Sequence, residues 1–270
     1  MNATHLKLPG IIDVHTHLFQ GEADLDEAEL ALSLRLADDA GVTRQIQLGN
    51  LRLGTPTFAR PDPEGIRKVN NHTLKAVARC PDRFIGFCYL NAANPTAASL
   101  EEIDRCCAVG PLRGLKFEFS LKATEPLYDP IVDRAEALGL PILHHAWINM
   151  EGGHEHESTP AEVAHLARRF PKVTFIMAHL GGARERGVCD IADCPNVLVD
   201  TSGSYPEAGH VEYAVRRLGA HRVVFGSDWP CRDYRTQLGR ILGSQISPEQ
   251  KAQILYHNAA RVLKLEGTRS

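Results

Sequence analysis

Residues 8–17 read Leu-Pro-Gly-Ile-Ile-Asp-Val-His-Thr-His, an apolar run that follows a Pro-Gly turn and leads into two histidines. The run predicts the first buried strand of a parallel sheet, because strands buried on both faces are continuously apolar. Successive side chains of a strand alternate between its faces, so His15 and His17 point the same way at its C-terminal end. Two imidazoles aimed at one point make half of a metal site. Taken alone, however, two histidines at this spacing can also be ordinary residues without a metal.

Eight strand-like segments alternate with helix-like segments along the chain. The helix limits carry typical signals, since Gly41 and Gly139 follow helical patterns and Pro160 begins one. No shift in composition marks a second domain. We therefore predict an α/β fold of the (β/α)8 TIM-barrel class, formed by residues 1–270 as a single domain. The expected strands are 8–12, 42–48, 84–90, 114–119, 141–145, 173–179, 196–200 and 222–226, and the named helices are 23–40, 65–79, 96–107, 129–138, one starting at 158–160, and 248–263.

Composition narrows the class of protein. The chain has 270 residues, 43% of them hydrophobic, and a formal charge of −3 without a basic stripe, so we expect no nucleic-acid partner. The seven cysteines show no CxxC spacing, which argues against a disulfide framework or a thiolate zinc site. No apolar run reaches the roughly 20 residues that a bilayer requires, and no signal pattern precedes the first strand. We expect a cytoplasmic enzyme with a small-molecule substrate and no membrane partner, and a homo-oligomer remains open.

Four predicted strand ends carry side chains of the metal-ligand type. In a (β/α)8 barrel the reactive groups come from the C-terminal ends of the strands and the loops that follow them. Neutral imidazoles with one carboxylate suit zinc, manganese or iron, and three histidines with one aspartate leave room for a water. These residues are His15 and His17 at the first strand, His145 at the fifth, His179 at the sixth and Asp228 after the eighth.

Six short motifs contain or adjoin these residues: DVHTH at 13–17, RGLK at 113–116, LPILHH at 140–145, AHLGG at 178–182, FGSDWP at 225–230 and NAAR at 258–261. Together they resemble the amidohydrolase superfamily, and within it the amidohydrolase-related branch that includes aminocarboxymuconate semialdehyde decarboxylase. The similarity covers nearly the whole chain. It implies the barrel fold and one divalent metal, with zinc expected first and manganese or iron as alternatives. It also implies that the metal is held by His15, His17, His145 and Asp228, with His179 as a supporting or catalytic histidine.

Two adjacent histidines compete for one of these roles. His144 and His145 must lie on opposite faces of their strand, so only one of them can look into the barrel. The spacing within the resembling motif favours His145. His144 would then pack between the strand and a helix.

Lys116 has three alternative roles. Some members of the resembling superfamily carry a carboxylated lysine there, which would bridge a second metal together with His179. The lysine could instead bind a substrate carboxylate, or pair with Glu118, which shares its strand face at i and i+2. The close branch resembles a one-metal pattern, so we favour a single metal.

The loops after the strands supply candidates for substrate binding. We interpret the loop 147–159, which contains His154 and His156, as a cover over the barrel mouth and not as a second metal motif. Arginines in such loops would suit an anionic substrate, and aromatic residues there could line a pocket. The arginines are Arg52, Arg60, Arg184, Arg186 and Arg232, and the aromatic residues are Trp147, Tyr205 and Trp229.

The main functional hypothesis is metal-assisted hydrolysis of a lactone, amide or ester. The cation would lower the pKa of a water toward about 7 and polarise the carbonyl group. Asp228 would act as general base, and His179 would stabilise or protonate the tetrahedral oxygen. Asp13, on the face of His15 and His17, would orient the ligands by hydrogen bonding.

A second reaction is compatible with the same residues. The resembling branch also supports metal-dependent, non-oxidative decarboxylation of a small aromatic or unsaturated carboxylic acid. There, His179 or a water activated by the metal would protonate the ring carbon that then loses CO₂. The sequence does not separate these two reactions.

Overall fold

The first strand carries the histidine pair. The computed structural model describes residues 8–18, 25–49, 60–148, 153–182, 186–203 and 207–265, and its first strand, β1, comprises Ile11–Thr16. Strand β1 begins and ends later in the sequence than the strand expected at 8–12. His15 therefore lies within β1 and His17 directly follows it, both of them buried.

All paired strands in the described residues are parallel and run in sequence order. They form two sheets, β1-β2-β3 and β4-β5-β6-β7-β8-β9. Phe87 alone separates β3 from β4, and its N–H still donates to Gln47 O at 3.0 Å, so β3 and β4 act as one barrel strand. The ring closes where Val14 N–H donates to Phe225 O at 2.9 Å. The later strands are β2 (Val42–Gln47), β3 (Phe84–Gly86), β4 (Cys88–Leu90), β5 (Leu115–Phe117), β6 (Ile142–His144), β7 (Phe175–Met177), β8 (Val197–Asp200) and β9 (Val223–Val224).

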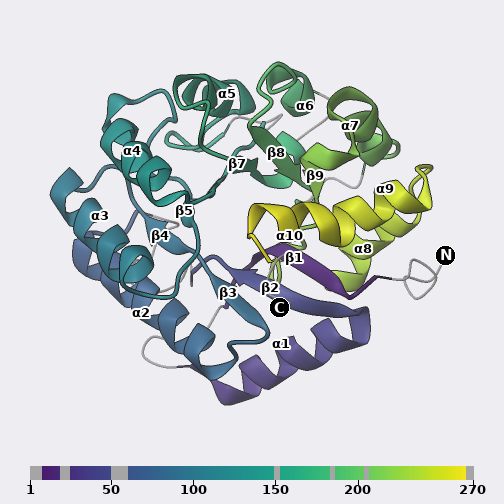
Figure 1. Ribbon diagram of the computed structural model, residues 1–270, viewed down its shortest axis with the longest axis horizontal. Helices are drawn as coiled ribbons and strands as arrows, with labels where there is room; N and C mark the ends of the chain where they lie inside the picture. Colours follow the sequence, from purple (N-terminus) through teal and green to yellow (C-terminus); the bar gives the residue numbers. More distant parts are fainter. Residues whose placement is uncertain are drawn as a thin grey trace.

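Helices surround this ring of strands (Figure 1). Their ends follow local chemistry: the Asp26 carboxylate accepts N–H groups at the start of α1, and Gly41 ends that helix at φ 78°, a value that suits glycine. Thr159 and Glu162 form a reciprocal capping box at the start of α5. The helices are α1 (Glu27–Ala40), α2 (Pro63–Arg79), α3 (Thr96–Ile103), α4 (Asp129–Leu138), α5 (Pro160–Arg169), α6 (Arg186–Asp190), α7 (His210–Leu218), α8 (Tyr234–Leu242), α9 (Pro248–Ala252) and α10 (Asn258–Val262).

Two expected helices are divided in the structure. The segment expected at 96–107 is α3 followed by a π-helical turn at Asp104–Ala108. The segment expected at 248–263 is α9, a π-helical turn at Gln253–His257, and α10. The (β/α)8 architecture predicted from the sequence is confirmed. Within the described part of the chain, no helix has the length and apolar character needed to cross a membrane.

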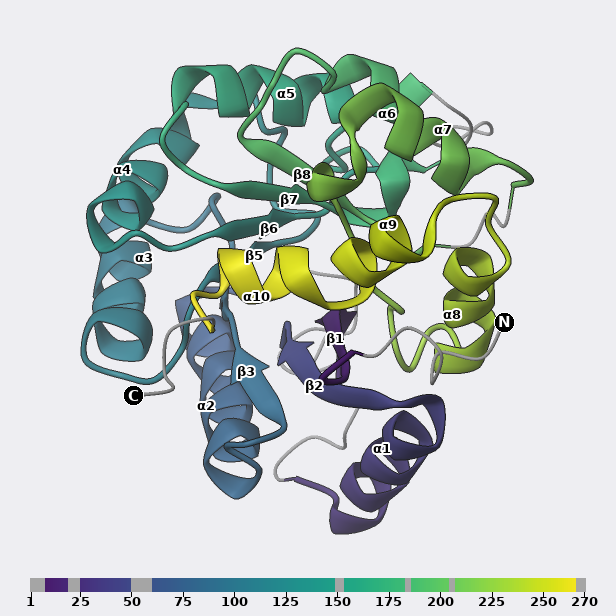
Figure 2. The same cartoon turned by 45° about the vertical axis from the view of Figure 1, so that its right-hand side comes forward.

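The barrel interior is filled and closed at one end. Leu143, Ile176, Leu198 and Val224, from successive strands, belong to one buried apolar cluster that also includes Ala260 of α10. Helix α10 lies across this end, where the strands begin (Figures 1 and 2). The predicted site residues therefore lie toward the opposite end.

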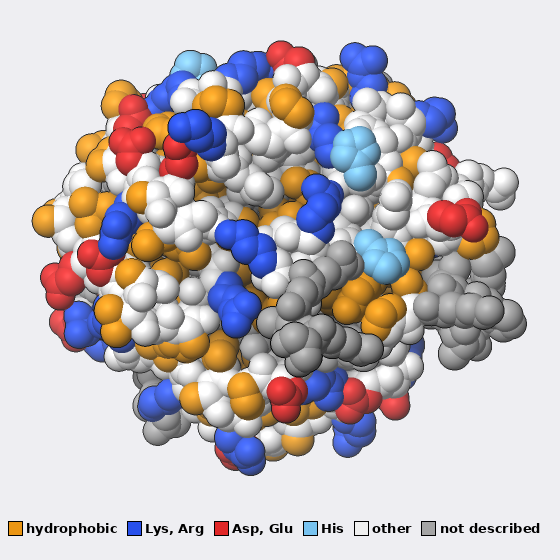
Figure 3. Space-filling view, viewed as in Figure 1, with side chains coloured by type: hydrophobic (Ala, Val, Ile, Leu, Met, Phe, Trp, Pro, Cys, Tyr) orange, Lys and Arg blue, Asp and Glu red, His pale blue; other side chains and the backbone are white. Residues whose placement is uncertain are grey.

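The α10 end has its own surface character. Lys and Arg side chains gather around the middle of this face (Figure 3). A cavity of about 320 Å³ opens among the strand starts and α10, and its basic lining residues are Lys172, Arg261 and Lys264.

Candidate metal centre

Two histidines at the end of β1 and one aspartate from the loop after β9 converge at the open end of the barrel. His15 Nε2 lies 3.5 Å from Asp228 Oδ1, and His17 Nε2 lies 3.7 Å from the same oxygen. Ligand atoms of the three residues all lie within 4.8 Å of one another, and all three residues are buried. This group has the size and the donor atoms that a divalent cation requires.

The proton positions on these imidazoles follow from their hydrogen bonds. His15 Nδ1 donates to Asp200 Oδ2 at 2.8 Å, and His17 Nδ1 donates to the backbone oxygen of Gly49 at 3.0 Å. Because both oxygens can only accept, each ring places a proton on Nδ1 and turns Nε2 toward Asp228. Nε2 is thus the atom of each ring that can bind a cation.

The backbone around Asp228 is fixed against β1. Asp228 has φ 66°, an uncommon value for a residue other than glycine, and its N–H donates to His15 O at 2.7 Å. Asp13 Oδ1 accepts the N–H groups of His15 and Ser227, each at 3.0 Å, and so orients both β1 and this loop. Burial raises the pKa of Asp228 above its usual range, against the opposing effects of His15 and Arg232.

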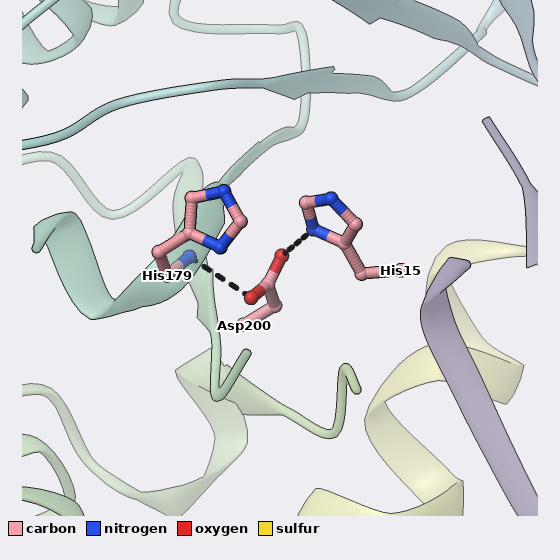
Figure 4. Close-up of side chains that lie close together, drawn as sticks. All are labelled: His15, His179 and Asp200. Carbon is pink, nitrogen blue, oxygen red and sulfur yellow. Dashed lines mark hydrogen bonds and ion pairs between the residues drawn. The ribbon is translucent and has the colours of Figure 1, made fainter. Parts of the chain in front are cut away.

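Asp200, at the end of β8, organises a second group of side chains with His15 and His179 (Figure 4). Its Oδ1 accepts the N–H groups of His179 and Ser202, each at 2.9 Å, and also the Ser202 hydroxyl. Burial opposes its negative charge, but His15 and these donors hold the pKa of Asp200 below its usual value. Because His15 directs its proton at Asp200, the carboxylate orients the imidazole and leaves Nε2 for coordination.

His179 follows β7 in a strained backbone conformation. It has φ 64° and the next residue, Leu180, has φ 53°, within a short 3-10 turn. Its ring lies between two partners, with Nδ1 2.8 Å from Ser202 Oγ and Nε2 3.2 Å from His145 Nδ1. Burial, His15 and His145 lower its pKa well below the usual value, so the ring is neutral.

His145 points into the barrel, as the sequence predicted, but two carboxylates hold it. Its Nδ1 lies 2.9 Å from Glu118 Oε1, and its Nε2 lies 2.8 Å from Glu157 Oε1. Burial alone would lower the pKa of His145, but Glu118 and Glu157 outweigh burial and raise it to about 9. His145 is outside the group formed by His15, His17 and Asp228. Its predicted role as a metal ligand thus stays a prediction.

His144 lies on the other face of β6. Its ring contacts Phe117 and Tyr128, with ring centroids 5.7 and 5.5 Å away, and its Nδ1 donates to His145 O at 2.6 Å. Burial lowers the pKa of His144 to about 4. The two histidines have thus taken the faces that strand alternation predicts.

Lys116 shows one of its three predicted alternatives. Its Nζ lies 2.8 Å from Glu118 Oε2, with both side chains buried. The contact is an ion pair without hydrogen-bond geometry. Burial would raise the pKa of Glu118, but Lys116 and His145 hold it well below the usual value. The structure displays the pair with Glu118, and a carboxylated Lys116 that bridges a second metal stays a hypothesis.

Two of the aromatic candidates can be placed. The Trp147 ring meets the His179 ring edge to face at 5.4 Å, whereas Trp229 stacks on Tyr234 at 4.8 Å. Among the candidate arginines, Arg60 is exposed and Arg232 is half-buried. Tyr205, Arg52, Arg184 and the side chain of Arg186 lie outside the described residues.

The amidohydrolase family model matches residues 12–265 of this sequence. This chain belongs to the amidohydrolase family. Its match begins in β1 and ends just after α10, so it includes every strand of the barrel. The resemblance inferred from the motifs is confirmed.

Four curated relatives of this amidohydrolase are named gamma-resorcylate decarboxylases. The gamma-resorcylate decarboxylase of a Polaromonas species is 25% identical over 86% of this chain and 86% of its own. The solved structure of a 2,6-dihydroxybenzoate decarboxylase from Rhizobium has a TM-score of 0.68 and 22% identity, covering 96% of this chain and 99% of that one. A dihydroxybenzoic acid decarboxylase from Polaromonas, solved with manganese and 2-nitroresorcinol, has a TM-score of 0.72 and 19% identity, covering 95% and 97%.

These matches correct the main functional hypothesis. Hydrolysis was predicted because three histidines and an aspartate suit water activation, but the named relatives of this amidohydrolase support decarboxylation instead. The same donor atoms serve both reactions, since the substrate decides which bond is weakened. The sequence-based ligand chemistry therefore could not separate them.

Sequence reasoning missed several buried polar partners in this amidohydrolase. Asp200 ends a predicted strand, so the strand-end rule that selected the histidines could have selected it too. Ser202 follows it by two residues. Glu157 and the Gly49 carbonyl carried no comparable signal, because a loop glutamate and a backbone oxygen look like many others in a sequence.

Proposed function

We propose that this protein is a metal-dependent, non-oxidative decarboxylase of a small aromatic carboxylic acid that carries a ring hydroxyl group. The observation that carries the proposal is the match over 86% of both chains to a gamma-resorcylate decarboxylase. The open barrel end adds a chemical argument, since it gathers buried imidazoles and carboxylates around one point. The carboxylates of this site would repel an anionic substrate unless a cation is bound beside them.

The donor atoms fit a divalent cation. His15 and His17 would bind it through Nε2, because their Nδ1 protons are committed to oxygens of the protein. Asp228 would supply a carboxylate oxygen, and His145 would be the fourth ligand. The metal we propose is manganese, with zinc or iron as alternatives, because a related solved structure contains manganese. When bound, such a cation would hold the substrate's negative charge and fix its orientation.

Decarboxylation needs a proton at a defined carbon. The proton adds to the ring carbon that bears the carboxylate. The bond between that ring carbon and the carboxylate carbon then breaks, and CO₂ leaves. The electron pair of the broken bond restores the aromatic ring. A ring hydroxyl next to that carbon supplies electron density. We assign the proton donation to Asp228, because its side chain lies at the open barrel end within 3.7 Å of His15 and His17, where the substrate carboxylate would meet the cation.

The test is a substrate assay on protein loaded with Mn²⁺ and checked for metal content. Hydroxybenzoates labelled with ¹³C in the carboxyl group, 2,6-dihydroxybenzoate first, should release labelled CO₂ and yield the corresponding phenol. In D₂O, the product should carry deuterium at the carbon that bore the carboxylate. Absence of CO₂ from every hydroxybenzoate, with one metal per chain confirmed, would overturn the proposal.

A further inference from the structure

The cavity at the α10 end lies where the strands begin, opposite the strand ends that carry the proposed metal centre. Its volume of about 320 Å³ is within the range of small-ligand pockets. The lining comes from α10 and from the segments that lead into β6, β7 and β8. A ligand with an apolar body would find apolar walls there. The apolar side chains of the lining are Leu140, Pro141, Val173, Pro195, Leu198 and Val262.

The charged side chains of this cavity are mostly cationic. Lys172, Arg261 and Lys264 line it, and among the described lining residues Glu136 is the one carboxylate. Three cations and one carboxylate leave a formal excess of two positive charges, whereas the whole chain carries a charge of −3. Lys and Arg side chains also gather on this face of the molecule (Figure 3). The local potential therefore favours an anionic ligand.

The three cations keep hydrogen-bond donors that a ligand can use. Lys172 Nζ lies 3.4 Å from Glu136 Oε1. Lys264 Nζ donates to a backbone oxygen at 3.4 Å, and Arg261 Nη2 donates to another at 2.7 Å. Ammonium and guanidinium groups each carry several N–H donors, so these single contacts leave others on every side chain. The cavity thus offers both positive charge and donors.

We propose that this cavity binds a small organic phosphate, a phosphate monoester with an apolar body. Near neutral pH the phosphate group carries a charge of about −1.5 to −2, which matches the two excess positive charges of the lining. Arg261 suits a bidentate contact with two phosphate oxygens, and the lysines act as point charges. The apolar body would pack on the apolar walls. This site is independent of the proposed metal centre and of the proposed reaction.

The test is isothermal titration calorimetry of the full-length protein with phenyl phosphate. EDTA is present, so that a metal at the other barrel end cannot bind the phosphate group. The native protein should bind phenyl phosphate at least about fivefold more tightly than inorganic phosphate, because the phenyl ring buries apolar surface in the cavity. Equal affinities for the two probes, or no heat of binding at phenyl phosphate concentrations on the order of 1 mM, would overturn the proposal.

Two substitutions with opposite expected effects locate the site. Lys172→Ala removes a cation and should weaken the binding of phenyl phosphate about fivefold. Glu136→Gln removes the opposing carboxylate and should strengthen it about threefold. Lys68→Ala and Glu64→Gln are the matched controls, since this exposed ion pair at 2.8 Å belongs to α2 and does not line the cavity. Both controls should keep the native affinity.

The variants also separate a site from general attraction to a charged surface. If Lys68→Ala lost as much affinity as Lys172→Ala, the protein would be attracting phosphate without a defined site, and the proposal would fail. The absence of any gain in Glu136→Gln would overturn it as well. None of these outcomes bears on decarboxylation, which is assayed separately with Mn²⁺.

Discussion

The imidazoles of the site differ in where each holds its proton. His15 and His17 keep theirs on Nδ1, toward Asp200 and the Gly49 carbonyl, whereas His145 faces a carboxylate with each ring nitrogen. Hydrogen-bond partners behind a metal ligand commonly change metal affinity by about 10- to 100-fold when they are removed. Substitution of these hydrogen-bond partners should therefore change the affinity of the site for metal.

Asp200→Asn tests this effect at His15. The amide removes the charged acceptor of the His15 Nδ1 proton, so we expect the affinity for Mn²⁺ to fall by about 10- to 100-fold. Titration of the metal-free protein with MnCl₂ measures it. Asp193→Asn is the control, because Asp193 is an exposed carboxylate whose described ion pair is with surface Arg168, at 2.7 Å. Equal affinities for the two variants would contradict the orienting role of Asp200.

Asp228→Asn tests the proposed proton donor. The amide cannot release a proton to the ring carbon, so kcat for decarboxylation should fall by about 100-fold or more. The measurement is CO₂ release at saturating substrate and Mn²⁺, with metal content and circular dichroism recorded for the same samples. Native kcat in a variant with full metal content would rule out Asp228 as the donor.

The candidate residues could be found from the sequence to different degrees. His15, His17 and Asp228 were accessible because strand ends in a barrel meet at one place, and the structure brings these three together. The hydrogen-bond partners of these histidines could not be found from the sequence. Glu157, for example, reaches His145 through a loop geometry that residue types do not fix. Strand alternation correctly predicted that His145 points into the barrel. It does not predict which oxygen atoms contact the ring nitrogens.

Among the elements, β6 shows most directly how one strand serves both the site and the packing around the barrel. His145 faces the centre, and His144 packs against Phe117 and Tyr128 on the opposite face. A buried neutral histidine resists protonation when the protein is folded. Its unfolded pKa of about 6.5 and its folded pKa of about 4 then make stability fall with acidity.

His144→Leu isolates this effect. The folded pKa lies below the unfolded value, so the His144 contribution is present above about pH 6.5 and is lost as the pH falls toward 4. Compared with pH 7, at pH 4.5 the variant should gain about 2.5 kcal/mol relative to the native protein. Urea unfolding of both metal-free proteins at the two pH values measures the difference. A stability difference that does not change with pH would contradict the burial argument.

Element limits were harder to predict than element order. The expected helix 129–138 coincides with α4, because Gly139 takes φ 63° and ends it. Strand 173–179 was expected to be longer than β7, Phe175–Met177, because its apolar pattern continues into the turn that carries His179. Helices α6, α7 and α8 were not named from the sequence, although Asp233 caps α8 through two N–H groups. Apolar periodicity finds elements, and backbone geometry at their ends decides their lengths.

The whole molecule should respond to metal through the linkage between binding and folding. A ligand that binds only the folded state at a concentration of a hundred times its Kd stabilises that state by about 2.7 kcal/mol. For a chain of this size, we expect Mn²⁺ at that level to raise Tm by about 5 °C or more. Differential scanning calorimetry with Mn²⁺ and with EDTA measures the shift. His15→Ala should lose it, and an equal shift in that variant would place the metal elsewhere.

Barrel closure has a consequence for how this protein is made. Residues 13–17 meet residues 225–229, so the proposed ligands lie far apart in the sequence. A nascent chain on the ribosome holds the first two imidazoles long before their carboxylate partner has been synthesised. By the proposed ligand set, cation capture is a late event in biogenesis, and a fragment that stops short of the last strand should carry no ion at this place.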